Sequence, residues 1–167
     1  MKVNGYQLRE ALRKWTTKLE IMKARFEESI WQFAGETKDL AKAADDWKRT
    51  IDNVAQVQCL QQLFNAQVTV QVAGSPMTLA YAVKLVGMLG QFEAAWRKAT
   101  FKKKERSYMD SEQMRSKENE YAVKSMPQAE IEQRADALGA YAADLRAAIA
   151  YGNAREIDVG AVAEGLL

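Results

Sequence analysis

Apolar side chains recur every three or four residues near the start of the chain, and this long stripe restricts the fold more than any other feature. Its members are Leu8, Leu12, Trp15, Leu19, Met22, Phe26, Ile30 and Phe33. The near-heptad spacing predicts a helix with one apolar face, capped by Asn4 at its start and ended by residues 34–39. Such a helix would be about 40 Å long. It therefore needs an equally long helical partner.

The segment 38–64 predicts that partner. Its apolar residues have the same spacing and are Leu40, Ala44, Trp47, Ile51, Val54, Val57, Leu60 and Phe64. The short polar link between the two segments indicates an antiparallel helical hairpin. Cys59 lies among the apolar residues of the second helix, so we expect a buried structural thiol rather than a nucleophile.

A third helix is expected after a change of period. Alternation in Val68–Val72 predicts a strand, and Thr78 is suited to cap the helix that follows. The apolar residues of this helix are Leu79, Val83, Val86, Leu89 and Phe92. Gly87 and Gly90 each cost about 1 kcal/mol inside a helix, and a close contact with another helix would explain them.

A fourth helix is indicated by Ser125, Pro127 and Glu130, which form a helix-start signal. Its stripe consists of Ile131, Ala135, Leu138, Ala142, Leu145 and Ile149. Two more pieces, 121–123 and 156–159, resemble strands. The three strand-like pieces either pair into one small sheet or remain separate.

These patterns predict a mainly α protein: a bundle of four long helices with two or three short strands at one end. The chain has 167 residues, 48% of them hydrophobic and 28% charged, which suits a single domain over 1–167. Residues 101–120 are almost entirely polar and lack periodicity, so we expect a mobile or ligand-ordered loop there.

Residue types that are missing argue against an enzyme. The chain has no histidine and one cysteine, which excludes Ser-His-Asp catalysis, imidazole-bound metals and an intramolecular disulfide. The adjacent carboxylates Asp45 and Asp46, or Glu27 and Glu28, point about 100° apart on a helix and are read as solvated. No glycine-rich phosphate loop is present. We expect no enzyme activity, no metal and no cofactor.

The location follows from two further absences. No run approaches the roughly 18 apolar residues that span a membrane, and the N-terminal residues lack an apolar signal region. We therefore expect a cytoplasmic protein without a membrane partner.

The stretch 96–110 is the strongest candidate for a binding site. Between Arg97 and Arg106, six basic residues and one acidic residue leave a local charge of +5, against a net charge of +2 for the whole chain. The candidate ligand-binding residues are Trp96, Arg97, Lys98, Phe101, Lys102, Lys103, Lys104, Arg106 and Tyr108. Arginine can bind phosphate with two donors, and the aromatic side chains can stack a base. The alternative is a solubilising helix end whose cations favour the helix dipole.

Several residues off the main stripes indicate contacts with another chain. Tyr6, Ile21 and Trp31 are apolar residues on an expected solvent face, which favours a homo-oligomer. Arg9, Arg13 and Arg134 could contribute to an anion pocket between subunits, and ordinary surface placement is the alternative for each.

Three motifs carry a resemblance to known proteins: "NGYQLREAL", "MTLAYAVKLVGMLG" and "LRAAIAYGNAREIDV". They resemble uncharacterised bacterial and phage-encoded helical proteins, and the element order is distantly similar to that of septicolysin-like proteins. The resemblance implies a small homo-oligomer of mostly helical subunits and a phage origin. It supplies no catalytic residue.

Three functions remain open. The first is a non-enzymatic oligomeric protein that sequesters a phosphate-bearing small ligand, by analogy with phage anti-defence proteins that hold nucleotide immune signals. The second is a structural or interaction protein that binds partner proteins through its heptad-patterned helices. Weak nucleic-acid binding is the third and is least favoured, because the net charge is close to zero.

Overall fold

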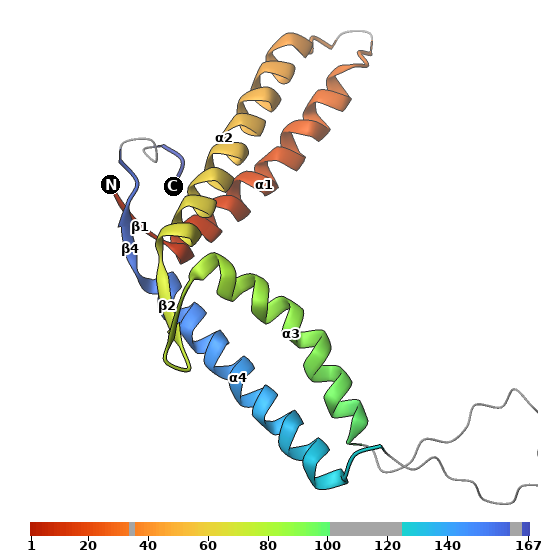
Figure 1. The fold of residues 1–167 in the computed structure, drawn as a ribbon. Coiled ribbons are helices and arrows are strands. Elements are labelled where there is room, and N and C mark those ends of the chain that lie inside the picture. The colour runs from red at the N-terminus through yellow and green to blue at the C-terminus, as the bar shows by residue number, and fades with distance from the viewer. Residues whose placement is uncertain (34–35, 101–124, 161–164) are drawn as a thin grey trace, which may run out of the picture. The chain divides into compact units, whose positions relative to one another are not determined.

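The chain has a mainly α fold in its computed structural model, which describes residues 1–33, 36–100, 125–160 and 165–167 (Figure 1). The element order is β1 (Lys2–Asn4), α1 (Gly5–Ser29), α2 (Leu40–Gln67), β2 (Thr69–Val72), β3 (Ser75–Thr78), α3 (Leu79–Ala99), α4 (Gln128–Ala154) and β4 (Glu156–Asp158). The predicted fold class, four long helices with a small β element, is confirmed. The order strand–helix–helix–strand therefore occurs twice along the described chain.

The described residues fall into two compact units. Unit 1 comprises Met1–Ala82 and Ala148–Leu167, and unit 2 comprises Val83–Ala147. Unit 1 holds the α1–α2 hairpin and all four strands, whereas unit 2 holds most of α3 and α4. The predicted polar loop at 101–120 lies outside the described residues. The single domain over 1–167 stays a prediction.

Helix α1 begins as predicted and ends earlier than predicted. Asn4 caps it in a capping box, since the Asn4 side chain accepts from the Gln7 amide and the Gln7 side chain accepts from the Asn4 amide, both at 2.9 Å. The helix stops at Ser29, so placing Ile30 and Phe33 within it was wrong. The Lys38 ammonium donates to the carbonyl oxygens of Glu28 and Trp31, and these bonds satisfy the end of the helix.

Helix α2 packs antiparallel along α1, as predicted, and the ring centroids of Phe26 and Trp47 are 5.2 Å apart. Val57, Leu60 and Phe64 are buried. Leu40, Ile51 and Cys59 were predicted to be buried and are exposed, because the buried face of α2 is narrower than its apolar stripe. The Cys59 thiol is therefore not a buried structural group.

The strands form two separate antiparallel pairs rather than one sheet. β2 pairs with β3, and β1 pairs with β4, with Val3 opposite Ile157. A shared sheet for 68–72 and 156–159 was therefore wrong. A second strand, β3, follows β2 directly, because Ala73 and Gly74 adopt positive φ angles of 49° and 81° and reverse the chain. Residues 121–123 lie outside the described residues.

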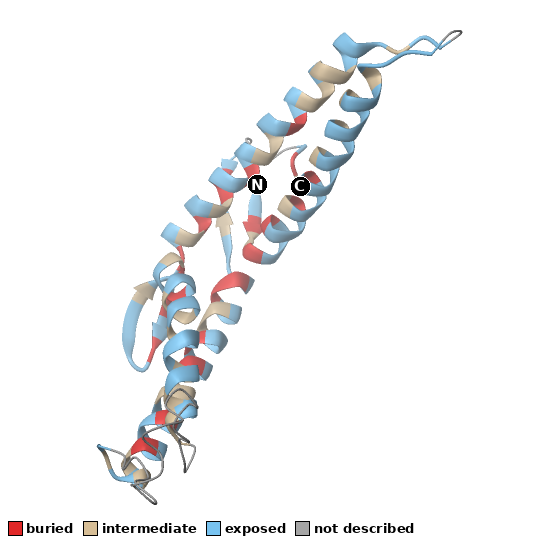
Figure 2. Ribbon diagram, turned by 90° about the vertical axis from the view of Figure 1, so that its right-hand side faces the viewer, coloured by how far each residue is buried: buried red, intermediate tan, exposed pale blue. Residues whose placement is uncertain are grey.

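The core of unit 1 lies where the strands meet the helix ends. Val3, Val70 and Val72 on the strands are buried, as are Leu8 of α1 and Leu79 of α3. In Figure 2 the rest of the α1–α2 hairpin is mostly exposed or half-buried. The hairpin therefore contributes to the core mainly through the buried residues of α1 and α2, among them Leu8, Leu60 and Phe64.

A residue near the C-terminus completes this core. The Trp15 indole Nε1 donates to the carbonyl oxygen of Leu166 at 2.7 Å, and both side chains are buried. The Lys18 ammonium lies 4.7 Å from the centroid of the same indole ring. Trp15 thus holds the C-terminal residues against α1.

Helix α3 starts at the predicted cap, where the Thr78 hydroxyl accepts from the Tyr81 amide at 3.2 Å. The close helix contact that was predicted to explain Gly87 and Gly90 does not occur within the described chain, because a Cβ added at either would meet no heavy atom within 4 Å. Neither glycine is needed for a helix contact within the described chain. No helix in the described part is long and apolar enough to cross a membrane.

Candidate functional site

The end of α3 places an acidic side chain between two arginines. The Glu93 carboxylate accepts from Arg97 Nε at 3.1 Å and Arg97 Nη2 at 2.9 Å, and Arg146 Nη2 of α4 lies 3.5 Å from its other oxygen. The Glu93 side chain is only 15% exposed. Hydrogen bonding from Arg97 holds the pKa of Glu93 below its usual value, so the group carries a negative charge that offsets one arginine.

Gly139 leaves space for the ion pair of Glu93 and Arg97. A Cβ added at Gly139 of α4 would lie 3.2 Å from Arg97 Nη2 and 3.8 Å from Glu93 Oε1. The distance to Arg97 is tighter than an ordinary contact, so a side chain at Gly139 would press on the guanidinium. The backbone of α4 is therefore part of the site.

An aromatic residue of α3 pairs with an arginine of α4. The indole of Trp96 is half-buried, with the Arg134 guanidinium of α4 5.8 Å from its ring centroid and Phe92 edge-on at 6.2 Å. Arg134 also bonds Glu130 at 2.8 Å through Nη2. Trp96 therefore makes a cation–π contact with an arginine of α4.

Three of the predicted site residues are described, and six are not. Trp96, Arg97 and Lys98 lie in the last two turns of α3, with Arg97 and Lys98 exposed. The residues outside the described chain are Phe101, Lys102, Lys103, Lys104, Arg106 and Tyr108. The structure therefore describes only the part of the predicted cluster that lies on α3.

Two residues of this site were missed in the sequence. Glu93 precedes Arg97 by four positions, the spacing of a helical ion pair, and this signal was present. Arg146 had no local signal, because it reaches Glu93 only when α3 and α4 run side by side. Both change the charge of the cluster, since Glu93 removes one positive charge and Arg146 restores it.

The other predicted arginines are elsewhere. Arg13 bonds Glu10 on α1 at 2.8 Å, and this contact lowers the pKa of Glu10. Arg9 is exposed on the same helix. A pocket between subunits that includes Arg9, Arg13 and Arg134 stays a prediction.

Large apolar side chains are exposed at several places. Trp31 and Phe33, beyond the end of α1, and Met88 of α3 are each 74% exposed. Ile21 is also exposed, and the Tyr6 hydroxyl donates to the carbonyl oxygen of Ala150 at 3.1 Å. Tyr6 thus has a contact within its own chain, whereas Trp31, Phe33 and Met88 present open apolar surface.

The donor set does not resemble a metal site. No group of three or more Cys, Asp or Glu side chains that could hold a metal ion occurs among the residues described.

Comparison with known protein families, curated proteins and solved structures finds no match to this chain.

Proposed function

We propose that the chain is a non-enzymatic, oligomeric binding protein that sequesters a phosphate-bearing small ligand. One observation carries the proposal: Arg97, Arg134 and Arg146 gather around Glu93 and Trp96 at the end of α3. The basic residues of the predicted cluster follow directly in the sequence. A nucleotide immune signal is one ligand of this class.

The hydrogen-bonding capacity of the arginines supports phosphate binding. A guanidinium has five N–H donors, and Arg97 uses two of its nitrogens on Glu93 while Arg146 uses one. The remaining donors can bind phosphate oxygens in pairs. A sequestering protein needs these contacts and no proton-transfer group.

The test is thermal unfolding in the presence of cyclic nucleotides, cyclic oligonucleotides and ADP-ribose derivatives. A ligand at about 100 times its dissociation constant adds about 2.7 kcal/mol to the free energy of unfolding. We expect an upward shift of Tm with one ligand class, and loss of that shift after charge reversal at Lys103 and Arg106. Unchanged Tm with every compound would refute the proposal.

A second candidate is a protein that binds partner proteins through its helices. It is favoured by the exposed Trp31 and Phe33 beyond the end of α1. Ligand-independent capture of one defined partner, abolished by Trp31→Ser, would support this function. Weak nucleic-acid binding is tested by its salt dependence, with a slope of roughly −0.9 per neutralised phosphate on duplex DNA.

A further inference from the structure

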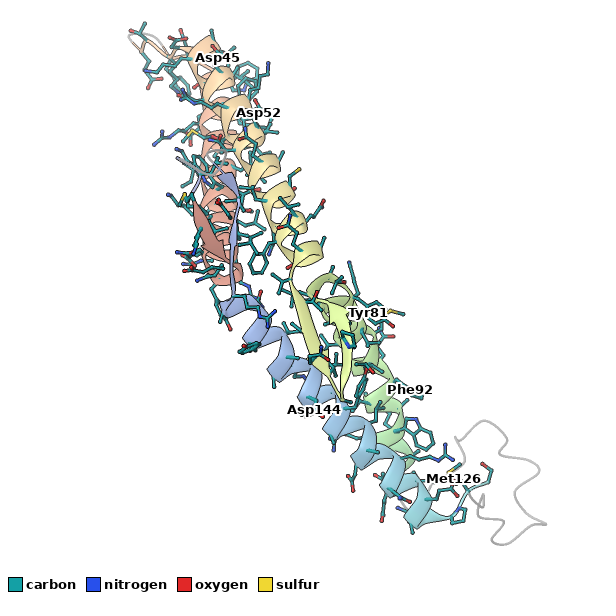
Figure 3. All side chains as sticks on the ribbon, turned by 60° about the vertical axis from the view of Figure 1, so that its left-hand side comes forward. Asp45, Asp52, Tyr81, Phe92, Met126 and Asp144 are labelled. Atoms are coloured by element: carbon teal, nitrogen blue, oxygen red, sulfur yellow. The ribbon has the colours of Figure 1, made fainter. Side chains whose placement is uncertain are left out.

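Helix α3 exposes apolar surface on both sides of its buried face. Met88 is 74% exposed and Phe92, labelled in Figure 3, is 54% exposed; we call these two residues the bulky flank. The other side, the small flank, consists of Val83, Gly87, Gly90 and Ala94, all exposed. At about 100° per residue the two flanks are about 150° apart around the helix. Apolar surface that extends beyond the buried face of a helix is normally covered.

The repeated element order provides a comparison inside the same chain. Asn4 caps the start of α1, and Thr78 caps the start of α3. The residues four positions after these caps are Leu8 and Ala82, and both are 0% exposed. Positions counted from these two residues therefore correspond. α1 shows what the same positions look like when they face solvent.

The corresponding positions differ sharply in polarity. Met88 and Phe92, ten and fourteen residues beyond Thr78, correspond to Lys14 and Lys18 of α1. The small flank corresponds to Arg9, Arg13, Thr16 and Glu20. α1 carries polar or charged side chains at all six positions, and α3 carries none. The α3 surface therefore has the composition of a protein contact rather than of a solvent-exposed face.

The undescribed parts of this chain do not have the composition to cover that surface. Residues 101–124 contain twelve charged side chains among 24 residues. The other two segments, 34–35 and 161–164, are too short to cover a face that extends from Val83 to Ala94. This surface is therefore open to another molecule.

The two flanks of α3 are complementary to each other. Met88 and Phe92 project as large side chains, and a Cβ at Gly87 or Gly90 would meet nothing within 4 Å. Small residues allow a neighbouring side chain to approach the helix backbone closely. A second copy of this chain thus brings the matching surface, and a net charge of +2 gives little repulsion between copies.

We infer that α3 is an interface between copies of this chain, in which Met88 and Phe92 of one copy pack against the small flank of the next. Because the two surfaces differ, the contact is heterologous and continues from copy to copy, as a ring where the rotation closes and as a filament where it does not. The inference rests on the oligomeric part of the proposed function and names the surface that forms the oligomer.

The experiment measures mass in solution by light scattering after size exclusion. We expect the wild-type chain at three or more times its 18.8 kDa. Phe92→Glu removes the bulky flank and Gly90→Glu obstructs the small flank, so each variant alone should run as a monomer. Met88→Glu is a second bulky-flank variant. Thr16→Glu, at the position of α1 that corresponds to Gly90, adds the same charge and should keep the wild-type mass.

Mixing the two monomeric variants tests the pairing of the flanks. Phe92→Glu keeps an intact small flank and Gly90→Glu keeps an intact bulky flank, so their mixture should form a dimer of about twice 18.8 kDa. Circular dichroism checks that each variant remains helical. A monomeric wild type, wild-type mass in the folded flank variants, or a mixture without dimers would overturn the inference.

The same samples separate this inference from ligand binding. A wild-type oligomer that is lost in the flank variants, with no Tm shift for any nucleotide, would leave the interface established and refute the ligand. A wild-type monomer whose Tm rises with a nucleotide would refute the interface and support the ligand.

Discussion

Gly152 of α4 lies so close to Val70 of β2 that a Cβ on the glycine would be 2.7 Å from Val70 Cγ1. The same Cβ would lie 3.1 Å from Leu79 Cδ1. All three residues belong to unit 1, and Val70 and Leu79 are buried. Gly152 is thus required for packing between a helix and a strand, beyond its role near the end of a helix.

Gly152→Ala should lower the free energy of unfolding by about 1–3 kcal/mol, because the added methyl overpacks a buried contact. Thr16→Ala is the control: Thr16 is exposed on α1, and alanine, the better helix former, should stabilise the helix by less than about 1 kcal/mol. Urea unfolding measures both. Equal effects of the two substitutions would contradict the packing at Gly152.

Trp15→Phe should destabilise the chain by about 1–3 kcal/mol, since it keeps an aromatic ring and leaves the buried carbonyl of Leu166 without its donor. Trp31→Phe should change stability by less than about 0.5 kcal/mol, because Trp31 is 74% exposed. Urea unfolding of the two variants measures the free energy of unfolding of each. A harmless Trp15→Phe would show that the C-terminal residues are not held by the indole.

Asp158 should make stability depend on acid pH. The Gly160 amide and then the Met1 ammonium hold the pKa of Asp158 below its ordinary value of 3.8. A depressed pKa stabilises the fold above the unfolded pKa, and this contribution is lost as pH falls through the folded pKa. Thermal unfolding from pH 6 to pH 2 should show a smaller loss of Tm in Asp158→Asn than in the wild type. Parallel curves would argue against the contact.

Glu93→Gln should strengthen binding of a phosphate-bearing ligand severalfold, because it frees Arg97 and Arg146 from a carboxylate. Arg97→Gln should weaken the same binding. Arg49→Gln, which removes an arginine paired with Asp46 on α2, is the control and should leave affinity unchanged. Calorimetric titration with the ligand identified by Tm shift measures all three. Weaker binding in Glu93→Gln would place the ligand elsewhere.

Local signals in the sequence predicted much of the fold. The caps at Asn4 and Thr78, the heptad spacing of α1 and α2, and the buried valines of β2 all depend on neighbours within a few residues. Such features can be read from spacing alone. The predicted helices are therefore close to the observed ones.

The errors concern contacts between distant residues. β1 was missed because its three residues pair with β4, more than 150 positions away. Cys59 and Ile51 were misplaced because an apolar residue on a helix does not show whether another element reaches it. Arg146 joins the site for the same reason: its partner Glu93 is 53 positions away.

Strand pairing across the two halves of the chain affects the order in which the fold forms. β1 precedes all the other described elements, and its partner β4 follows them. During translation the α1–α2 hairpin can form early from nearby residues, whereas β1 must wait for nearly the whole chain. A nascent chain halted after β2 would hold a helical hairpin with both of its flanking strands unpaired.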